Sequence, residues 1–134
     1  MKYQLTSHRK TVFDVVKASM DHPTARQVFD RAIQKSPRLS FATVYNSLKY
    51  LSDHGLIKQV SFGEDYVRYD GMLSRHDHLF CRNCHQVTDL MDLTIPSTSN
   101  FSLPLGFKVE EVSLKITGLC QNCQKLDILE EQLA

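Results

Sequence analysis

The four cysteines of this 134-residue chain form two C-x2-C pairs, Cys81 with Cys84 and Cys120 with Cys123. Each pair presents two thiolates on one tight turn, so two such turns can complete a tetrahedral sulfur shell around Zn2+. Spacing alone leaves two alternatives open: a thioredoxin-like redox pair, which needs a βαβ pattern that this part of the sequence does not show, and two local disulfides. We predict a structural zinc site, whose binding free energy stabilises the small domain around it.

The composition is that of a soluble globular protein, with 42% hydrophobic and 23% charged residues. No apolar run approaches the roughly 18 residues that a membrane span requires. The first residues, Met1 to Thr6, do not resemble a signal peptide. The sequence therefore predicts a cytoplasmic protein with no membrane partner, in which paired cysteines favour metal or redox chemistry over structural disulfides.

Charge and cysteine content divide the chain near Met72. Residues 1–72 carry 11 basic and 7 acidic residues, a net charge of +4, and no cysteine, whereas residues 73–134 carry 5 basic and 8 acidic residues, a net charge of −3. We predict two domains with these bounds. The basic first domain favours a polyanionic partner, although ordinary surface charge explains the same numbers.

Residues 1–72 predict three helices followed by a hairpin. Valines 12, 15 and 16 recur at helical spacing and predict a helix over about 7–19. Thr24 and Gln27 have the spacing of a capping box, which predicts the start of a second helix that ends near Pro37. A third helix is predicted from Ser40, and strands over 56–62 and 66–70 follow it.

The third predicted helix is the candidate DNA-contacting element. Its buried stripe is expected to contain Phe41, Val44, Leu48 and Leu51. The other face carries hydroxyl, amide and ammonium groups that can contact phosphates and base edges, although a merely solvated face is the alternative. Three helices and a hairpin are typical of the winged variant of the helix-turn-helix, whose third helix enters the major groove. The predicted DNA-contacting residues are Ser40, Thr43, Tyr45, Asn46 and Lys49.

Residues 73–134 predict a small domain with three strands and a helix. Strands are expected over 78–81 and 86–89, on either side of the first cysteine pair. Alternation over 107–117 predicts a longer strand with one buried face formed by Val112, Leu114 and Ile116. The Ser-rich segment 93–105, with two prolines, predicts mostly loop, and leucine spacing predicts a short C-terminal helix.

A second group of metal-ligand types surrounds the run His76-Asp77-His78. Residues two apart in a strand share a face, so both imidazoles can bind one metal ion, although two surface histidines beside a zinc turn have the same spacing. Asp70 and Asp89 flank the pair, and imidazoles with carboxylates suit Mn2+ or Fe2+ better than thiolates do. His22, taken alone, is more simply explained as a residue at a helix start.

These features, in this order, resemble the ferric uptake regulator (Fur) superfamily over essentially the whole chain. The matching motifs are His22-Pro23-Thr24-Ala25, Ala42-Thr43-Val44-Tyr45-Asn46-Ser47-Leu48, Arg68-Tyr69-Asp70, His76-Asp77-His78 and the two C-x2-C pairs. The resemblance implies an α+β fold, with an N-terminal winged helix-turn-helix domain followed by a small α/β dimerisation domain stabilised by zinc. It also implies a homodimer that binds double-stranded operator DNA.

The resemblance further implies a regulatory site for Fe2+ or Mn2+ at the hinge between the domains. The implied ligands are His22, Asp70, His76, His78 and Asp89. An ion bound by both domains would fix the angle between them, so metal and DNA would each raise the affinity for the other.

The aspartate at position 89, where iron-responsive members typically have glutamate, resembles the peroxide-sensing (PerR) members. In these members bound Fe2+ reacts with hydrogen peroxide, a ligand histidine is oxidised, and the repressor leaves DNA. The oxidisable positions here are His22 and His76. Such a protein is consumed rather than turning over, so the expectation is a sensor and not an enzyme. The alternatives are an iron-, zinc- or manganese-responsive regulator of the same family and, from another class, a zinc-bound thiol redox protein.

Three positions depart from the family pattern. Arg75 and Val112 stand where many iron regulators have histidine ligands, so an auxiliary metal site between them is not expected. His85 follows Cys84 where the family usually has glycine, and it is predicted to be a turn residue with positive φ.

Overall fold

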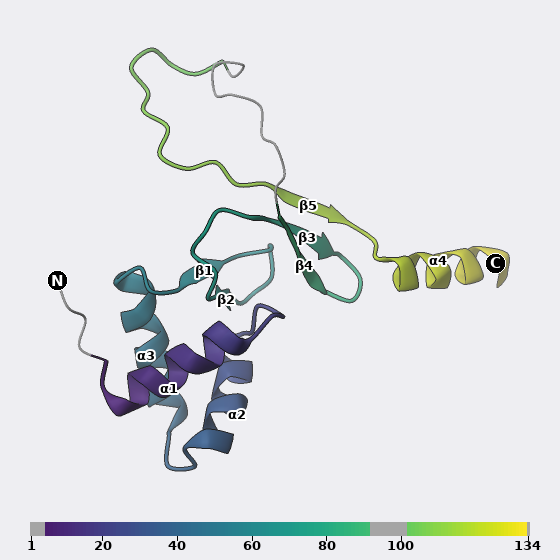
Figure 1. Cartoon of the computed structure of the whole chain (residues 1–134). Helices are drawn as coiled ribbons and strands as arrows, with labels where there is room; N and C mark the ends of the chain where they lie inside the picture. The colour runs from purple at the N-terminus through teal and green to yellow at the C-terminus, as the bar shows by residue number, and fades with distance from the viewer. Residues whose placement is uncertain (1–4, 92–101, 134) are drawn as a thin grey trace. The chain divides into compact units, whose positions relative to one another are not determined.

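The computed structural model describes residues 5–91 and 102–133, and for residues 126–131 it describes the backbone only. The chain divides between Ser74 and Arg75 into two compact units (Figure 1). Each unit has its own sheet, of two strands in the first and three in the second. The α+β fold class is therefore confirmed, and the assignment of DNA binding and dimerisation to residues 1–72 and 73–134 stays a prediction.

The first unit opens with three helices, α1 (Ser7–Ala18), α2 (Ala25–Lys35) and α3 (Phe41–Asp53). The side chain of Thr24 accepts from the N–H of Gln27, and the side chain of Gln27 accepts from the N–H of Thr24, which completes the predicted capping box of α2. Ser40 caps α3 by accepting from the N–H of Thr43 at 3.1 Å. All three predicted helices are confirmed, because their caps and apolar stripes are local signals.

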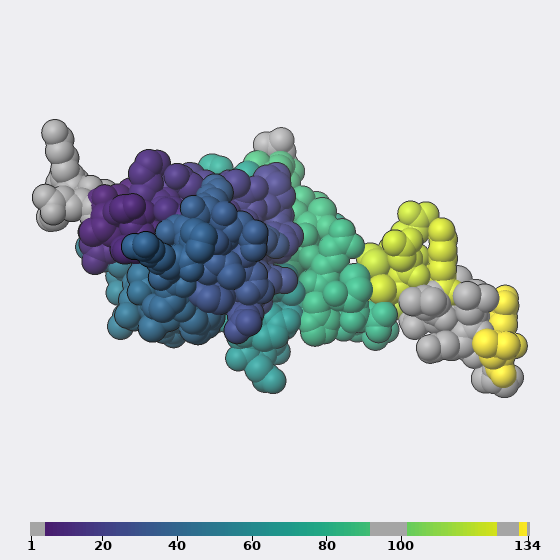
Figure 2. Space-filling view, turned by 90° about the horizontal axis from the view of Figure 1, so that it is seen from below, coloured from purple at the N-terminus to yellow at the C-terminus, as the bar shows by residue number. Residues whose placement is uncertain are grey.

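The core of this unit lies between the three helices. Val12 of α1, Val28 of α2 and Leu48 of α3 are each fully buried, and burial of one such side chain contributes about 1.5–3 kcal/mol. Figure 2 shows the helical residues, coloured purple to blue, as one continuous mass. The prediction that Phe41 is buried was wrong: it is 41% exposed, because it opens α3 beyond the core and packs edge-on against Phe29 instead.

A hairpin follows α3, formed by strands β1 (Lys58–Val60) and β2 (Arg68–Asp70), which pair antiparallel. Residues 61–67, which join these strands, are called the wing below. Both strands are shorter than predicted, but the order of three helices and a hairpin confirms the winged helix-turn-helix fold. β2 also contacts the segment before α2, since the N–H of Tyr69 donates to the carbonyl of Pro23 at 2.9 Å.

The second unit contains a three-stranded sheet in the order β4-β3-β5. Strands β3 (Asp77–Cys81) and β4 (Val87–Leu90) pair antiparallel, whereas β5 (Lys115–Gly118) lies parallel to β3. His85 occupies the turn between β3 and β4 with φ 62°, which confirms the predicted positive φ. The predicted C-terminal helix is also confirmed as α4 (Gln121–Leu133).

The prediction for residues 107–117 was wrong in length and in burial. Only Lys115–Gly118 forms a strand, and Leu114 and Ile116 are 40% and 45% exposed. Alternation fixes which side chains share a face, but burial requires a second surface against that face. The predicted loop over 93–105 lies mostly outside the described residues. Across the described parts of both units, no helix combines the length and the apolar character needed to cross a bilayer.

Candidate metal centres and nucleic-acid interface

The four cysteines come together at one end of the second sheet. Cys81 ends β3, Cys84 lies in the following turn, and Cys120 and Cys123 lie at the start of α4. The parallel pairing of Cys81 with Gly118 brings the second pair beside the first. All four thiols are free, and their sulfur atoms lie within 4.8 Å of one another, as one tetrahedral ion requires.

The electrostatics of this cluster favour a bound cation. The N–H of Cys120 donates to the sulfur of Cys81 at 3.4 Å and lowers the pKa of the Cys81 thiol to about 6. The amide of Asn83 donates to the sulfur of Cys123 at 3.3 Å, but the adjacent Cys120 thiol and burial outweigh it and raise the pKa of Cys123 to about 11. The Cys81 thiolate forms readily, whereas the neighbouring thiols raise the pKa of Cys84 and of Cys123, because like charges would crowd there. A divalent cation removes this conflict, so the donor set fits structural zinc.

His22 and Asp70 form a buried pair in the first unit. The Nε2 atom of His22 lies 3.2 Å from a carboxylate oxygen of Asp70, and the two side chains are 3% and 8% exposed. Asp70 ends β2, and its other oxygen accepts from the N–H of Met72 at 2.9 Å. His22 has φ 53°, a left-handed conformation that is uncommon for a residue other than glycine. Such an outlier is typical of a functional position.

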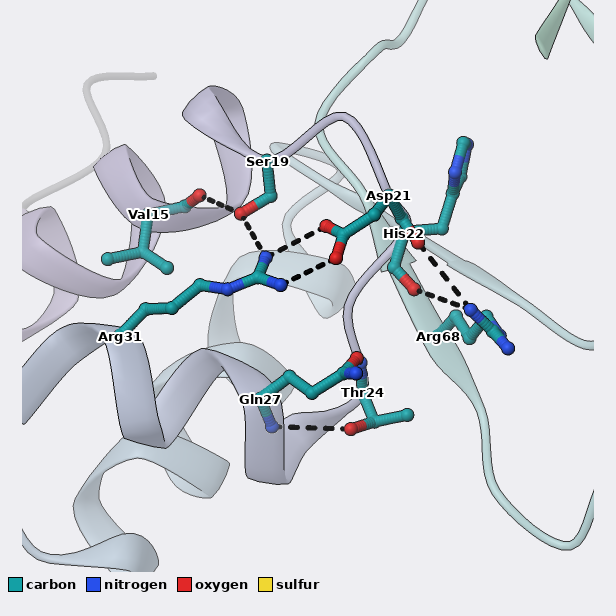
Figure 3. A network of polar contacts seen from close by, with 8 residues as sticks. All are labelled: Val15, Ser19, Asp21, His22, Thr24, Gln27, Arg31 and Arg68. Carbon is teal, nitrogen blue, oxygen red and sulfur yellow. Dashed lines mark hydrogen bonds and ion pairs between the residues drawn. The ribbon is translucent and has the colours of Figure 1, made fainter. Parts of the chain in front are cut away.

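The loop that carries His22 is anchored to α2 (Figure 3). Arg31 donates through two nitrogens to both carboxylate oxygens of Asp21, at 2.8 and 2.5 Å, and lowers the pKa of Asp21. Arg31 also donates to the hydroxyl of Ser19 at 2.9 Å. Roles for Ser19, Asp21 and Arg31 were not predicted, because their contacts join α2 to the preceding loop and follow no periodic pattern.

His76, His78 and Asp89 form a compact group in the second unit. The Nε2 atoms of both histidines lie 3.5 Å from the same oxygen of Asp89. This arrangement follows from the sheet register, in which His78 of β3 pairs with Asp89 of β4, and His76 lies two residues earlier on the same face. The three side chains are 3%, 12% and 19% exposed, and the set has the ligand types that Fe2+ and Mn2+ accept.

Asp77 lies between these two histidines, where strand alternation turns successive side chains to opposite faces, and it is fully buried. Its carboxylate accepts from the N–H of Leu114 at 2.8 Å and from the guanidinium of Arg75 at 3.0 Å. Burial acts to raise the pKa of Asp77, but these two donors outweigh it and lower the pKa. Arg75 also donates to the carbonyl of Val112 at 3.3 Å. The guanidinium therefore joins the two positions between which no auxiliary metal site is expected.

The predicted DNA-contacting residues lie at the start and along one face of α3. Tyr45 is 51% exposed, Asn46 and Lys49 are exposed, and Thr43 is half-buried. The hydroxyl of Ser40 lies 2.9 Å from that of Thr43. The structure therefore presents a polar helix face to solvent, and its contact with DNA stays a prediction. Sequence reasoning missed Arg9 of α1, whose guanidinium lies 3.6 Å from the ring centroid of Tyr50 and adds a cation beside α3.

Comparisons with known proteins give one consistent family. Residues 1–117 match the model of the ferric uptake regulator family. The peroxide operon regulator of Bacillus subtilis (strain 168) is 33% identical over 91% of this chain and 85% of that protein. The peroxide-responsive repressor PerR of Staphylococcus saprophyticus is 28% identical over 90% of this chain and 82% of that protein. The structure of the ferric uptake regulator from Francisella tularensis with iron has the same fold, with a TM-score of 0.73, 20% identity and coverage of 92% of this chain and 96% of that chain.

Proposed function

This chain belongs to the ferric uptake regulator family, and on that premise we propose that it is a metal-dependent repressor that senses hydrogen peroxide. The observation that carries the proposal is the separation of two donor chemistries. Thiolates alone form one group, and buried imidazoles with carboxylates form the others. The names of the relatives, peroxide operon regulator and PerR, support the peroxide-sensing type over the iron-responsive type.

The proposed metals follow from the donors. A structural Zn2+ is bound by the four cysteines, Cys81, Cys84, Cys120 and Cys123. Four thiolates bind it tightly, so it stays bound when the supply of metal changes. The pair His22 and Asp70 and the group His76, His78 and Asp89 together bind one Fe2+ or Mn2+. Neither set alone offers the five or six donors that such ions commonly take, which supports a shared ion between the two units.

The proposed sensing step depends on the ligand histidines. Hydrogen peroxide is the two-electron oxidant in this step, and bound Fe2+ would supply the chemistry that breaks its O–O bond. One peroxide oxygen is added to a ring carbon of His22 or His76, and the other leaves as water. Addition of oxygen to an imidazole ring removes donor strength from a residue that one unit contributes to the shared site. The metal ion is then no longer bound by ligands from both units. DNA affinity falls because metal binding and DNA binding are thermodynamically linked. The protein acts as a regulator and is consumed, so it is not an enzyme.

The proposed partners are operator DNA and a second copy of the chain. Tyr45, Asn46 and Lys49 on the exposed face of α3 supply the polar contacts for a major groove. In the second unit, Leu79, Leu114 and Ile116 are exposed by 37–45%, and an apolar surface of this kind is typical of an interface. A homodimer would present two α3 helices to two half-sites about one turn of DNA apart.

Operator binding tests this function directly. A duplex is first selected from a random pool by the Mn2+-loaded protein, and its affinity is measured with Mn2+, with Fe2+ and after removal of the regulatory metal. Both metals should raise the affinity, and hydrogen peroxide should abolish the gain for the Fe2+ form alone. If the Fe2+ form stays bound to DNA after peroxide treatment, the chain is an iron-, zinc- or manganese-responsive regulator and not a peroxide sensor. If no metal changes the affinity, the regulatory site itself is wrong.

A further inference from the structure

Arg68 is bonded to the wing through an ion pair that is almost fully buried. Its Nε and Nη2 atoms donate to the two oxygens of Glu64 at 2.8 and 3.1 Å, and the two side chains are 10% and 4% exposed. A two-point contact of this kind fixes the orientation of both groups. The carboxylate of Glu64 is therefore turned inward, although its backbone lies in a solvent-exposed loop.

The rings of the wing complete this cluster. Tyr66 donates its hydroxyl to Glu64, and the Arg68 guanidinium lies 5.9 Å from the ring centroid of Tyr66 and 6.0 Å from that of Phe62. These three residues all belong to the wing, so its conformation depends on the position of one guanidinium.

The same guanidinium also contacts the loop that carries His22 (Figure 3). Its Nη1 atom lies 3.4 Å from the carbonyl oxygen of His22 and 3.5 Å from that of Asp21. The backbone of Arg68 pairs with that of Thr24, and Asp70 lies two residues further along β2. An ion bound by His22 and Asp70 would restrain this loop and β2 against each other, and Arg68 with them.

We propose that Arg68 is a positioning residue that couples the His22–Asp70 pair to the wing. It does so by keeping the carboxylate of Glu64 turned inward, away from DNA phosphates, when an ion is bound. In winged-helix proteins the wing contacts the DNA backbone beside the third helix, where an outward carboxylate would repel phosphate. This inference rests on the proposed metal-dependent DNA binding, and it adds a route for the metal signal that stays inside the first unit.

Hydrogen exchange in the full chain, followed by mass spectrometry with and without Mn2+, tests the coupling. In the wild type, Mn2+ should slow exchange in segment 20–24 and in the wing. In Glu64→Gln, which keeps the shape and removes the charge, Mn2+ should still slow segment 20–24 but leave the wing unchanged. The matched control is Asp30→Asn, which removes a carboxylate from the exposed Arg26–Asp30 pair of α2 and should behave as the wild type.

DNA affinity separates this coupling from a merely structural role. With the duplex selected above, Glu64→Gln should raise the affinity of the metal-free protein, because it removes the repelling charge, and leave that of the Mn2+ form unchanged. The gain in affinity due to Mn2+ should thus fall about threefold to tenfold, within the usual range of coupling between two sites. Arg68→Lys, which keeps the charge and loses the two-point contact, should also reduce the gain.

Four results would overturn the inference. One is a wing that responds to Mn2+ in Glu64→Gln and Arg68→Lys as it does in the wild type. Another is an equal loss of DNA affinity with and without metal, which indicates that Glu64 only stabilises the fold. The third is a wild type in which Mn2+ slows segment 20–24 but not the wing, and there the inference fails while the proposed function stands. If Mn2+ protects neither segment of the wild type, both fail.

Discussion

The imidazole of His22 and the carboxylate of Asp70 face each other across 3.2 Å, and both are almost completely buried. Burial of an ionisable pair costs stability unless further partners share the charge. The left-handed backbone of His22 and the hydrogen bond from Met72 to Asp70 both serve to hold these groups in place. Groups whose orientation the fold fixes lose little entropy when they bind an ion, which is the property a reversible metal sensor needs.

The contacts of Arg31 with Asp21 and Ser19 should affect how tightly the pair of His22 and Asp70 binds a metal ion. We expect Arg31→Gln to weaken Mn2+ binding by roughly 10-fold, the usual effect of removing a group that orients a metal ligand. Calorimetric titration with Mn2+ measures this effect, and Arg26→Gln, at an exposed arginine of the same helix, is the matched control. Equal Mn2+ affinity in Arg31→Gln and Arg26→Gln would contradict the positioning role of Arg31.

The zinc site should be required for folding. Cys81→Ser or Cys123→Ser removes one sulfur from the shell, so the zinc content should fall and the protein should become unstable or monomeric. Thermal unfolding, size-exclusion chromatography and zinc analysis check this outcome. As a control, wild-type protein stripped by a chelator should recover its unfolding temperature when zinc is added back. A stable, dimeric Cys123→Ser protein that binds operator DNA would show that the site is dispensable.

The exposed face of α3 should separate specific from general DNA contacts. Tyr45→Ala is expected to weaken operator binding by about 1–3 kcal/mol and to relax sequence preference. Lys49→Ala should instead weaken binding to all duplexes and lower the slope of the salt dependence by about 1. Titrations of operator and unrelated duplexes at several salt concentrations measure both effects. A folded Tyr45→Ala protein with unchanged operator affinity would show that another surface contacts the bases.

The pair of Arg75 and Asp77 should stabilise the second unit. Arg75→Ala leaves the fully buried carboxylate of Asp77 with the N–H of Leu114 as its remaining described donor, so we expect a loss of about 1–3 kcal/mol of unfolding free energy. Urea unfolding of the zinc-loaded protein measures this loss. Lys108→Ala, at an exposed cation of the same unit, is the control. If the two variants unfold at the same urea concentration, the guanidinium contributes nothing measurable.

The helices of the first unit could be predicted from the sequence because their determinants are local. The capping box of Thr24 and Gln27 and the serine cap at Ser40 act over one helical turn, so they specify where α2 and α3 begin. The shared face of His76 and of His78 in β3 could be predicted from residue alternation for the same reason.

Other features depend on contacts that no local pattern contains. The left-handed residue His22 follows Asp21, whose carboxylate accepts from Arg31, a residue 10 positions away in the sequence. The strand around Ile116 was predicted to be buried because its apolar residues alternate. That prediction was wrong, since alternation does not say what covers a face. The same limit applies to Phe41, which has the helical spacing of a core residue but is the first residue of α3.

The choice of Asp at position 89 should tune peroxide sensing. Asp89→Glu keeps the charge and lengthens the side chain, so the oxygen that lies 3.5 Å from both imidazoles would shift. We expect this variant to bind Mn2+ and Fe2+ and to respond weakly to peroxide. Operator release at increasing peroxide concentrations, compared with the wild type at equal iron occupancy, measures the change. An unaltered peroxide response would show that the length of this ligand does not matter.

Mass spectrometry of the Fe2+-loaded protein after peroxide treatment tests the central claim most directly. We expect a gain of one oxygen on the peptide that contains His22 or on the one that contains His76, together with loss of operator binding. The Mn2+-loaded protein, treated in the same way, should show neither change. Operator binding that survives peroxide with iron bound, with both histidines unmodified, would contradict peroxide sensing by this protein.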